Sequence, residues 1–181
     1  AFCKTPAHID RALALVEARL RQHPHLSLSV DLEGMLGSQQ AHIDLMQIAV
    51  DAAEPSEAQL VFVIDMDRFG AVALSAHSTL RTLLEDPKVV KVLHCMSGDA
   101  NALYVEHGVA LAGAFDTGIA DCLLRGAGLN RQRKLDTVIH EFLATPMSLK
   151  ESFVHVPRMF AKRPLPADYF VYAYEDVIHC N

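Results

Sequence analysis

The sequence predicts a single domain of mixed α/β class that spans residues 1–181. A chain of 181 residues is long enough to bury one sizeable core, and its 51% hydrophobic and 21% charged residues are ordinary for a folded protein. Strand-like runs alternate with segments of helical periodicity, without internal repeats or low-complexity tracts. No apolar run approaches the roughly 18 residues of a membrane span, so we expect no membrane-embedded segment.

The first part of the chain predicts a helix, three strands and a second helix. Thr5 and Pro6 suit a helix cap and first turn. Apolar residues follow at helical spacing, namely Ile9, Leu13, Val16 and Leu20. Three β-like runs separated by polar or Gly-rich breaks are typical of a meander, and they cover residues 26–33, 42–50 and 59–66. The second helix is expected near 76–85.

The second part adds two strands and four helices. The run VVKVLH at 89–94 predicts a buried strand, and residues 98–108 predict a helix that ends at Gly108. Residues 109–117 predict a fifth strand. The other helices are expected near 117–125, near 131–144 and from Pro166 onward, with a proline-containing loop over 144–165.

Two acids stand at the end of the first β-like run. Side chains alternate along a strand, so Asp31 and Glu33 point to one face while Leu32 points to the other. Two carboxylates placed together repel each other unless a cation neutralises them, and Mg²⁺ or Mn²⁺ suits carboxylate oxygen. Taken alone, this pair fits an exposed strand end equally well.

A third acid lies where the strand VVKVL runs into a helix. Asp99 is expected in the first helical turn, where free backbone N–H groups favour a carboxylate. The alternative is a simple helix cap. His94 and Met96, just before it, suit either a hinge and core packing or substrate contact.

The fourth acid and a tyrosine share one face of the last helix. Tyr172 and Asp176 are four positions apart, whereas Tyr174 lies on another face. A tyrosine hydroxyl beside a catalytic water can orient it or help to deprotonate it. The alternative is a core tyrosine with an exposed acid.

The charge distribution bears on the class of partner. A formal net charge of −6 argues against nucleic acid, yet eight basic and only three acidic residues between positions 125 and 164 give that stretch a charge of +5. This basic stretch is either a solvated helical face with a loop or a flank that faces a polyanionic substrate. Its basic members are Arg125, Arg131, Arg133, Lys134, Lys150, Arg158, Lys162 and Arg163.

Four segments in a fixed order connect these residues to a known family. They are DLEG, KVLHCMSGDANALY, FDTGIAD and RPLPADYFVYAYEDV, from about position 26 to the end. Together they resemble the DEDD superfamily of 3′→5′ exonucleases, in the RNase D-like branch with tyrosine in its third motif (DEDDy). The first three are similar in wording to Egalitarian-type exonuclease domains. Position 171 is Val, so the histidine variant of the third motif is absent.

The resemblance implies an RNase H-like fold, in which helices flank a mixed five-stranded sheet. It also implies that Asp31, Glu33, Asp99 and Asp176 hold two divalent cations, Mg²⁺ or Mn²⁺, while Tyr172 positions the attacking water. The implied reaction is two-metal-ion hydrolysis that removes 5′-mononucleotides from 3′ ends of single-stranded RNA.

Further residues are candidates for substrate contact. By the same resemblance, Glu33 and the backbone of Gly34 and Met35 hold the terminal ribose. The other candidates are His94, Met96, Leu103 and Arg163.

Two features depart from the family pattern. Phe160 stands where the family often has tryptophan, and the sequence ends five residues after Asp176, so we expect a C-terminal truncation and a missing accessory domain. Two alternative functions stay open. One is a catalytically silent RNA-binding or adaptor domain, and the other is a DNA 3′→5′ exonuclease that uses the same acids.

The cysteines and the first residue bear on localisation. Cys3, Cys95, Cys122 and Cys180 are far apart and form no CxxC pair, which disfavours zinc ligation by cysteine and indicates reduced, intracellular thiols. The chain opens on Ala1, so we expect that the native N-terminus is absent and that any targeting segment is missing from view. The sequence therefore does not distinguish cytosol, nucleus and mitochondrion.

Overall fold

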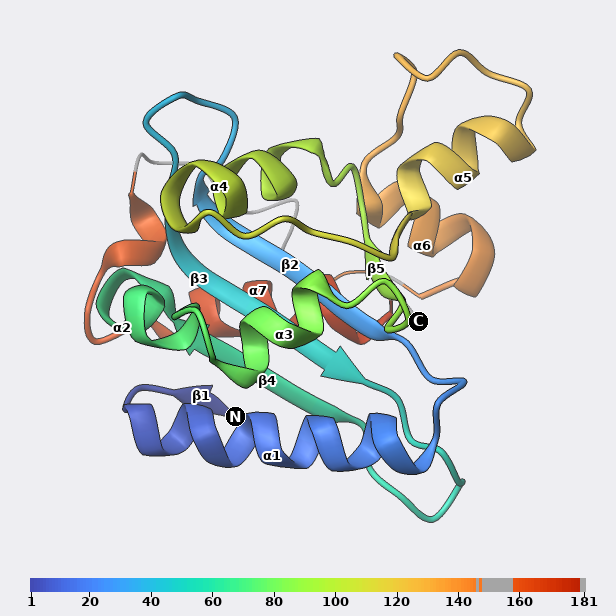
Figure 1. The fold of residues 1–181 in the computed structure, drawn as a ribbon. Helices are drawn as coiled ribbons and strands as arrows, with labels where there is room; N and C mark the ends of the chain where they lie inside the picture. Colours follow the sequence, from blue (N-terminus) through green and yellow to red (C-terminus); the bar gives the residue numbers. More distant parts are fainter. Residues whose placement is uncertain (146, 148–157, 180–181) are drawn as a thin grey trace.

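The computed structural model describes residues 1–145, 147 and 158–179, and a mixed six-stranded sheet lies at its centre (Figure 1). The strands are β1 (Phe2–Cys3), β2 (Leu28–Met35), β3 (His42–Val50), β4 (Leu60–Asp65), β5 (Lys91–Leu93) and β6 (Ala114–Asp116), in the order β1-β4-β3-β2-β5-β6. The predicted meander is confirmed, because β2, β3 and β4 pair antiparallel. The other three pairings, β1 with β4, β2 with β5 and β5 with β6, are parallel.

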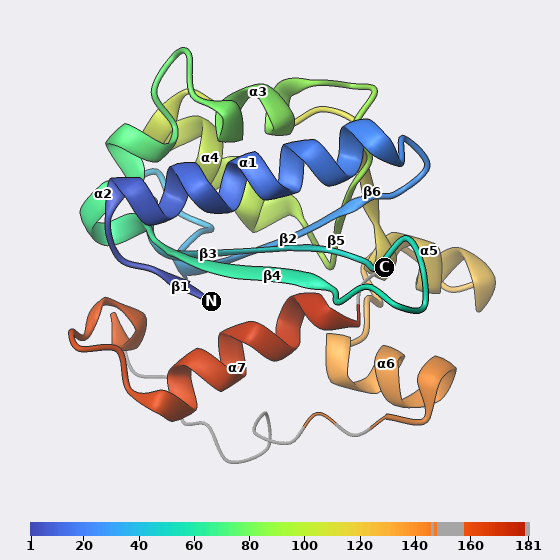
Figure 2. The same cartoon turned by 90° about the horizontal axis from the view of Figure 1, so that it is seen from below.

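Helices flank both faces of this sheet. They are α1 (Pro6–Gln22), α2 (Met66–Ala73), α3 (Thr79–Glu85), α4 (Ser97–His107), α5 (Thr117–Leu124), α6 (Leu135–Leu143) and α7 (Ala167–Ile178), with a 3-10 turn, η1 (Met159–Ala161), before α7. Figure 2 shows α1, α3 and α4 on one face and α7 on the other. Helices α5 and α6 lie beyond the β5–β6 edge (Figure 1).

The first helix forms for the reasons that the sequence predicts. The hydroxyl of Thr5 accepts a hydrogen bond from the His8 amide at 3.2 Å, and Pro6 takes the first helical position, where its missing N–H costs nothing. The apolar stripe of α1 packs on the sheet, and its buried members are Ile9, Ala12, Leu13, Val16 and Leu20.

Two hydrophobic layers cover the two faces of the sheet. The larger one joins α1, α2, α3 and α4 to one face, and it includes Leu32 from β2. The smaller one joins α7 and η1 to the other face through Leu45, Val63, Phe160 and Tyr172. Because Leu32 belongs to the larger layer, its neighbours Asp31 and Glu33 are turned toward the α7 face, as strand alternation requires.

Two elements were not predicted. Strand β1 has only two residues, too few for a recognisable pattern, and it raises the strand count from the predicted five to six. Helix α2 begins at Met66, where the third predicted strand was expected to end. It buries Met66, Gly70 and Ala73, and the His107 ring lies 3.1 Å from where a Cβ on Gly70 would sit, so a glycine there serves close packing.

Two other expectations concern the membrane and the thiols. Among the described residues, no helix combines the length and apolarity that a membrane span requires. Cys3, Cys95 and Cys122 are free thiols, and Cys180 lies outside the described residues.

Candidate active site

A β-bulge sets the geometry of the two acids on β2. The pairing with β3 places Glu33 opposite Leu45 and then shifts register before Gly34. Gly34 has φ +150°, and a Cβ there would lie 2.1 Å from the carbonyl oxygen of His42, so this position accepts glycine alone. The bulge therefore fixes where β2 bends, directly after its acids.

Helix α7 brings a third carboxylate to the same place. Asp31, Glu33 and Asp176 can each offer one oxygen such that the three atoms lie within 4.8 Å of one another. Asp176 is 4% exposed, and the two strand acids are half-buried. We call these three residues the acid trio. Three carboxylates held so close in a partly dehydrated site require positive charge, and an all-oxygen donor set suits a hard divalent cation.

Tyr172 lies beside the acid trio, one turn before Asp176. Its ring packs on Phe160, with centroids 5.7 Å apart. Burial raises the pKa of the Tyr172 phenol, and the charges of Asp176, Glu33, Asp31 and Asp136 raise it further. The phenol thus keeps its proton at neutral pH.

Asp99 stands next to the acid trio without belonging to it. As predicted, it lies in the first turn of α4. Burial raises the pKa of Asp99 to about 7, and the negative charge of Asp116 adds to this rise. Hydrogen bonds from the backbone amides of Asp99 and Leu32 lower the pKa and offset part of the rise. The hydrogen bond from the Leu32 amide places the Asp99 carboxylate against β2. Leu32 is the residue between Asp31 and Glu33. Its Oδ1 atom is buried without a hydrogen-bond partner in the described structure.

A cleft of about 660 Å³ opens over the trio. Its walls come from β2, α7, the turn after β5 and the segment that enters α6. The lining residues are Asp31, Leu32, Glu33, His94, Cys95, Gln132, Arg133, Lys134, Leu135, Asp136, Tyr172 and Asp176. Gln132 and Asp136 were not singled out from the sequence, because they belong to no recognisable motif and approach the acids only through the fold.

The turn between β5 and α4 is held by an acid of the FDT segment. Asp116 accepts hydrogen bonds from the amides of Cys95 at 2.9 Å and Met96 at 3.0 Å, and it also caps α5. Cys95 has φ +57°, an uncommon conformation for a residue with a side chain. Asp116 thus stabilises the strained turn that leads to Asp99.

His94 connects this turn to the opposite wall of the cleft. Its Nε2 lies 2.8 Å from the carbonyl oxygen of Arg133, which can only accept, so Nε2 carries a proton. Its Nδ1 lies 2.9 Å from the hydroxyl of Thr117. Both ring nitrogens are therefore engaged within the protein, and His94 shapes the cleft wall. Met96 is half-buried against the larger core layer and does not line the cleft.

The same wall is held by an ion-pair cluster around Asp121. Arg125 and Arg133 both bind this carboxylate, which is 2% exposed, and Arg133 also pairs with Glu141. Hydrogen bonds from Arg133, and to a smaller extent from Arg125, hold the pKa of Asp121 below its usual range. Two members of the basic stretch are thus committed to internal pairing, although Arg133 lines the cleft together with Lys134.

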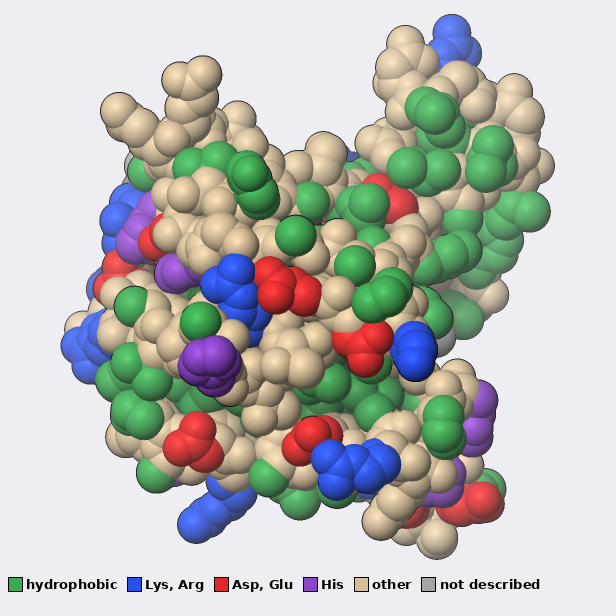
Figure 3. Space-filling model, in the orientation of Figure 1, with side chains coloured by type: hydrophobic (Ala, Val, Ile, Leu, Met, Phe, Trp, Pro, Cys, Tyr) green, Lys and Arg blue, Asp and Glu red, His purple; other side chains and the backbone are tan. Residues whose placement is uncertain are grey.

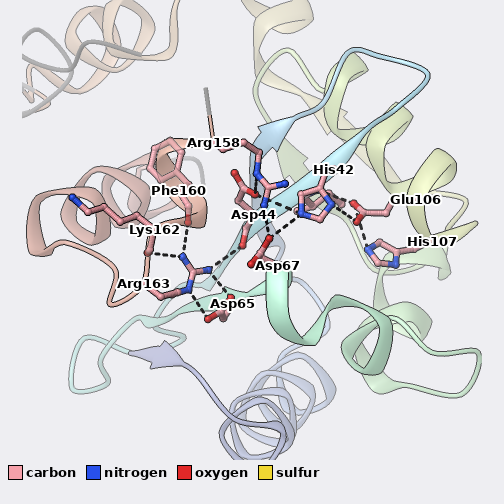
Figure 4. A network of polar contacts seen from close by, with 11 residues as sticks. His42, Asp44, Asp65, Asp67, Glu106, His107, Arg158, Phe160, Lys162 and Arg163 are labelled. Carbon is pink, nitrogen blue, oxygen red and sulfur yellow. Dashed lines mark hydrogen bonds and ion pairs between the residues drawn. The ribbon is translucent and has the colours of Figure 1, made fainter. Parts of the chain in front are cut away.

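Two predicted substrate contacts, Leu103 and Arg163, do not line the cleft. Leu103 is 0% exposed in the larger core layer, so it presents no surface to a substrate. Arg163 uses its guanidinium in a bidentate pair with the buried Asp65, with Nε 2.7 Å from Oδ2, and it also donates to the carbonyls of Phe160 and Lys162 (Figure 4). It anchors η1 to the end of β4, away from the cleft. Lys150, another member of the basic stretch, lies outside the described residues.

The fold and the acid trio together define a nuclease domain of the RNase H-like class. The chain matches the model of the 3′-5′ exonuclease family over residues 7–180, and it belongs to that family. No curated protein matches it by sequence.

Solved structures share this fold. The chain is similar to Trypanosoma brucei RNase D in complex with RNA U12, at 20% identity and a TM-score of 0.78 over 99% of this chain and 59% of that one. The chain is also similar to the catalytic core of Trypanosoma brucei RRP6, at 22% identity and a TM-score of 0.71 over 99% of this chain and 43% of that one. A third similar structure is Brucella melitensis NrnC with bound Mg²⁺, at 22% identity and a TM-score of 0.63 over 85% of this chain and 67% of that one. The chain spans only 41 to 43% of the first structures that it matches.

Proposed function

We propose that this chain is a metal-dependent 3′→5′ exoribonuclease that removes 5′-mononucleotides from single-stranded RNA. The observation that carries the proposal is the acid trio, three carboxylates with oxygens within 4.8 Å beside a tyrosine in an open cleft. Membership of the 3′-5′ exonuclease family supports the reaction. The RNA complex of one structural neighbour and the Mg²⁺ complex of another support the substrate and the cofactor.

The residues present fit two divalent cations, Mg²⁺ or Mn²⁺. Asp31, Glu33 and Asp176 supply three close oxygens, and Asp99 adds a fourth carboxylate whose Oδ1 atom has no protein donor in the described structure. Bound cations of this kind lower the pKa of water and offset charge on a phosphoryl oxygen and a leaving group.

The chain's own groups then supply orientation. The Tyr172 phenol is protonated at neutral pH, as tyrosines ordinarily are, so its hydroxyl can hydrogen-bond the attacking water and hold it at the scissile phosphate. Lys134, at the start of α6 in the cleft wall, offers a positive charge to the polyanionic strand. The tyrosine in this position supports the DEDDy subtype, which we propose for this chain together with the similarity to Egalitarian-type domains.

The cleft also suggests why the end of the strand must be unpaired. Glu33 belongs to the trio and the exposed residues Gly34 and Met35 follow it on β2, so the proposal assigns contact with the terminal ribose to these three residues. A site that must contact both the terminal ribose and the adjacent phosphate can accept only an unpaired 3′ end, because base pairing would hide that end. Met35 is 45% exposed, which leaves its side chain available for stacking on a base.

Four substrates in Mn²⁺ test the proposal. We expect the chain to degrade 5′-labelled single-stranded RNA one nucleotide at a time from a free 3′ hydroxyl, to stall on a blunt duplex and a 3′-phosphorylated strand, and to stop when chelator is added. Faster degradation of the matched DNA strand would favour the DNA exonuclease, and binding without nucleotide release would favour the adaptor. Fragments from a circular RNA would show internal cleavage and refute the exonuclease.

A matched pair of variants tests the site. Asp31→Ala should abolish nucleotide release while RNA binding survives, because it removes one of the three close oxygens. Asp10→Ala, an exposed change on α1 across the sheet, should leave the rate unchanged. Near-normal release by Asp31→Ala, with a normal circular dichroism spectrum, would refute the site.

A further inference from the structure

A second group of metal-binding side chains lies outside the cleft. His42 begins β3, Asp44 follows it on the same strand, and Asp67 lies in the first turn of α2 (Figure 4). One ligand atom from each lies within 4.8 Å of the other two. None of the three lines the cleft over the acid trio. We call these residues the His42 cluster.

The orientation of the His42 ring points to a cation. Its Nδ1 lies 2.8 Å from Oε1 of Glu106, which as a carboxylate accepts the Nδ1 proton. Nε2 lies 3.1 Å from Asp67 Oδ1 and 3.6 Å from Asp44 Oδ1, so either a ring proton or a cation must lie between this nitrogen and the two carboxylates. Acceptors that face one another need a positive charge between them. A carboxylate behind a histidine that faces a metal is a common arrangement in metal sites.

The burial of Asp44 is the second, independent observation. Its side chain is 1% exposed, and its Oδ2 atom has neither a hydrogen bond nor an ion pair in the described structure. Burial of a carboxylate without donors is costly. The side chain is therefore short of positive charge.

Arg158 fills part of this need. Its Nε lies 3.0 Å from Asp44 Oδ1 and its Nη2 2.5 Å from Asp67 Oδ1. This one guanidinium is shared between two carboxylates, so its single positive charge offsets only one of their two negative charges. The Arg158 side chain is 41% exposed and can swing into water without disturbing the core. It occupies the place of a cation without satisfying every oxygen.

We propose that His42, Asp44 and Asp67 form a binding site for a divalent transition metal such as Zn²⁺, with Glu106 orienting His42 and Arg158 displaced by the ion. One imidazole nitrogen and two carboxylates form a three-ligand donor set that suits Zn²⁺ with water in the fourth position. Mg²⁺ is disfavoured because it prefers an all-oxygen shell. The site is independent of the function proposed for the cleft.

A bound ion would connect elements that are distant in sequence. His42 and Asp44 belong to β3 and Asp67 to α2, while Glu106 lies in the last turn of α4, whose first turn carries Asp99. Binding to the folded state alone would stabilise the domain by linkage. In a variant that lacks the two strand carboxylates of the acid trio, we therefore expect Zn²⁺ to raise the melting temperature and Mg²⁺ to leave it unchanged.

Cobalt titration of the full chain tests the proposal. The double variant Asp31→Asn, Glu33→Gln removes two members of the acid trio, so that the remaining site is measured alone. We expect one equivalent of Co²⁺ to give visible d–d absorption, to be displaced by Zn²⁺ and to resist excess Mg²⁺. Arg158→Gln should tighten binding, and Glu106→Gln should weaken it by about 10- to 100-fold, the usual effect of losing such a partner.

Three further variants decide between this site and other ligands. In the same background, Asp67→Asn and His42→Gln should each weaken Co²⁺ binding at least tenfold, about 1.4 kcal/mol. His25→Gln alters the surface pair His23 and His25, whose rings lie 6.0 Å apart, and should change nothing. Loss of binding in His25→Gln, unchanged binding in His42→Gln, or no binding even with Arg158→Gln would overturn the proposal.

X-ray absorption of the Zn²⁺-loaded background variant gives an answer even if a His42 variant fails to fold. The expected shell holds one imidazole nitrogen with oxygen ligands. A shell without imidazole, or one with sulfur, would overturn the assignment.

Discussion

Asp99→Asn should stabilise the metal-free domain at alkaline pH. The Asp99 carboxyl is 6% exposed, and burial raises its pKa from an ordinary 3.8 to about 7. Between about pH 4 and pH 7 the folded state holds a proton that the unfolded state has released. The free energy of unfolding therefore falls as pH rises through this window, and the loss is complete above it.

The size of this stability loss follows from the difference between the pKa of Asp99 in the unfolded state and its pKa in the folded state. About three pH units at about 1.4 kcal/mol each give an upper limit of about 4 kcal/mol. This is a large part of the roughly 5 to 15 kcal/mol that stabilises a typical domain. Asparagine at position 99 carries no charge at any pH, so the variant should avoid most of this loss and be more stable than the wild type at pH 8 by about 2 to 4 kcal/mol.

Urea unfolding in EDTA, followed by circular dichroism at pH 5, 6, 7 and 8, measures this difference. The gap between Asp99→Asn and the wild type should widen with pH, and the exposed control Asp10→Asn should follow the wild type. Saturating Mg²⁺ at pH 8 should stabilise the wild type more than Asp99→Asn, because only the wild type offers the carboxylate. Parallel curves for Asp99→Asn and the wild type would refute the burial argument.

Three other predictions follow from the described geometry. Tyr172→Phe should lower kcat about 100-fold or more with little change in KM, as single-turnover and steady-state RNA cleavage can show, and an unchanged kcat would make the hydroxyl structural. Gly34→Ala places a Cβ 2.1 Å from a β3 carbonyl oxygen and should cost about 1 to 3 kcal/mol or more in urea unfolding, whereas Gly37→Ala, with open space around it, should be near neutral. Arg163→Met leaves Asp65 buried and unpaired and should cost about 3 to 5 kcal/mol, with partial recovery when Asp65→Asn is added; full stability of Arg163→Met alone would contradict the pairing.

Local periodicity predicted much of the fold and the relative placement of the acids. Alternation along β2 put Asp31 and Glu33 on one face, and four-residue spacing put Tyr172 and Asp176 on one side of α7. Both patterns act within one element, where backbone geometry alone decides side-chain direction. The structure then shows that the two faces meet.

Contacts between distant segments were not predictable in this way. Arg163 was taken for a substrate contact because nothing in its own segment reveals Asp65, which is 98 positions away. Leu103 shares a helix with Asp99, yet whether it faces the cleft or the core depends on how α4 packs. The His42 cluster was missed for the same reason, since its residues come from β3 and α2 and match no motif.

The sequence separation within the acid trio has a consequence for when the protein becomes competent. Asp31 and Glu33 lie on the first long strand, but Asp176 lies on α7, the most C-terminal described helix. During synthesis, the strand acids leave the ribosome long before their partner exists, so a nascent or prematurely terminated chain cannot assemble the trio. Any hydrolytic activity that depends on the trio is thereby confined to chains that have been made through α7 and have docked that helix on the sheet.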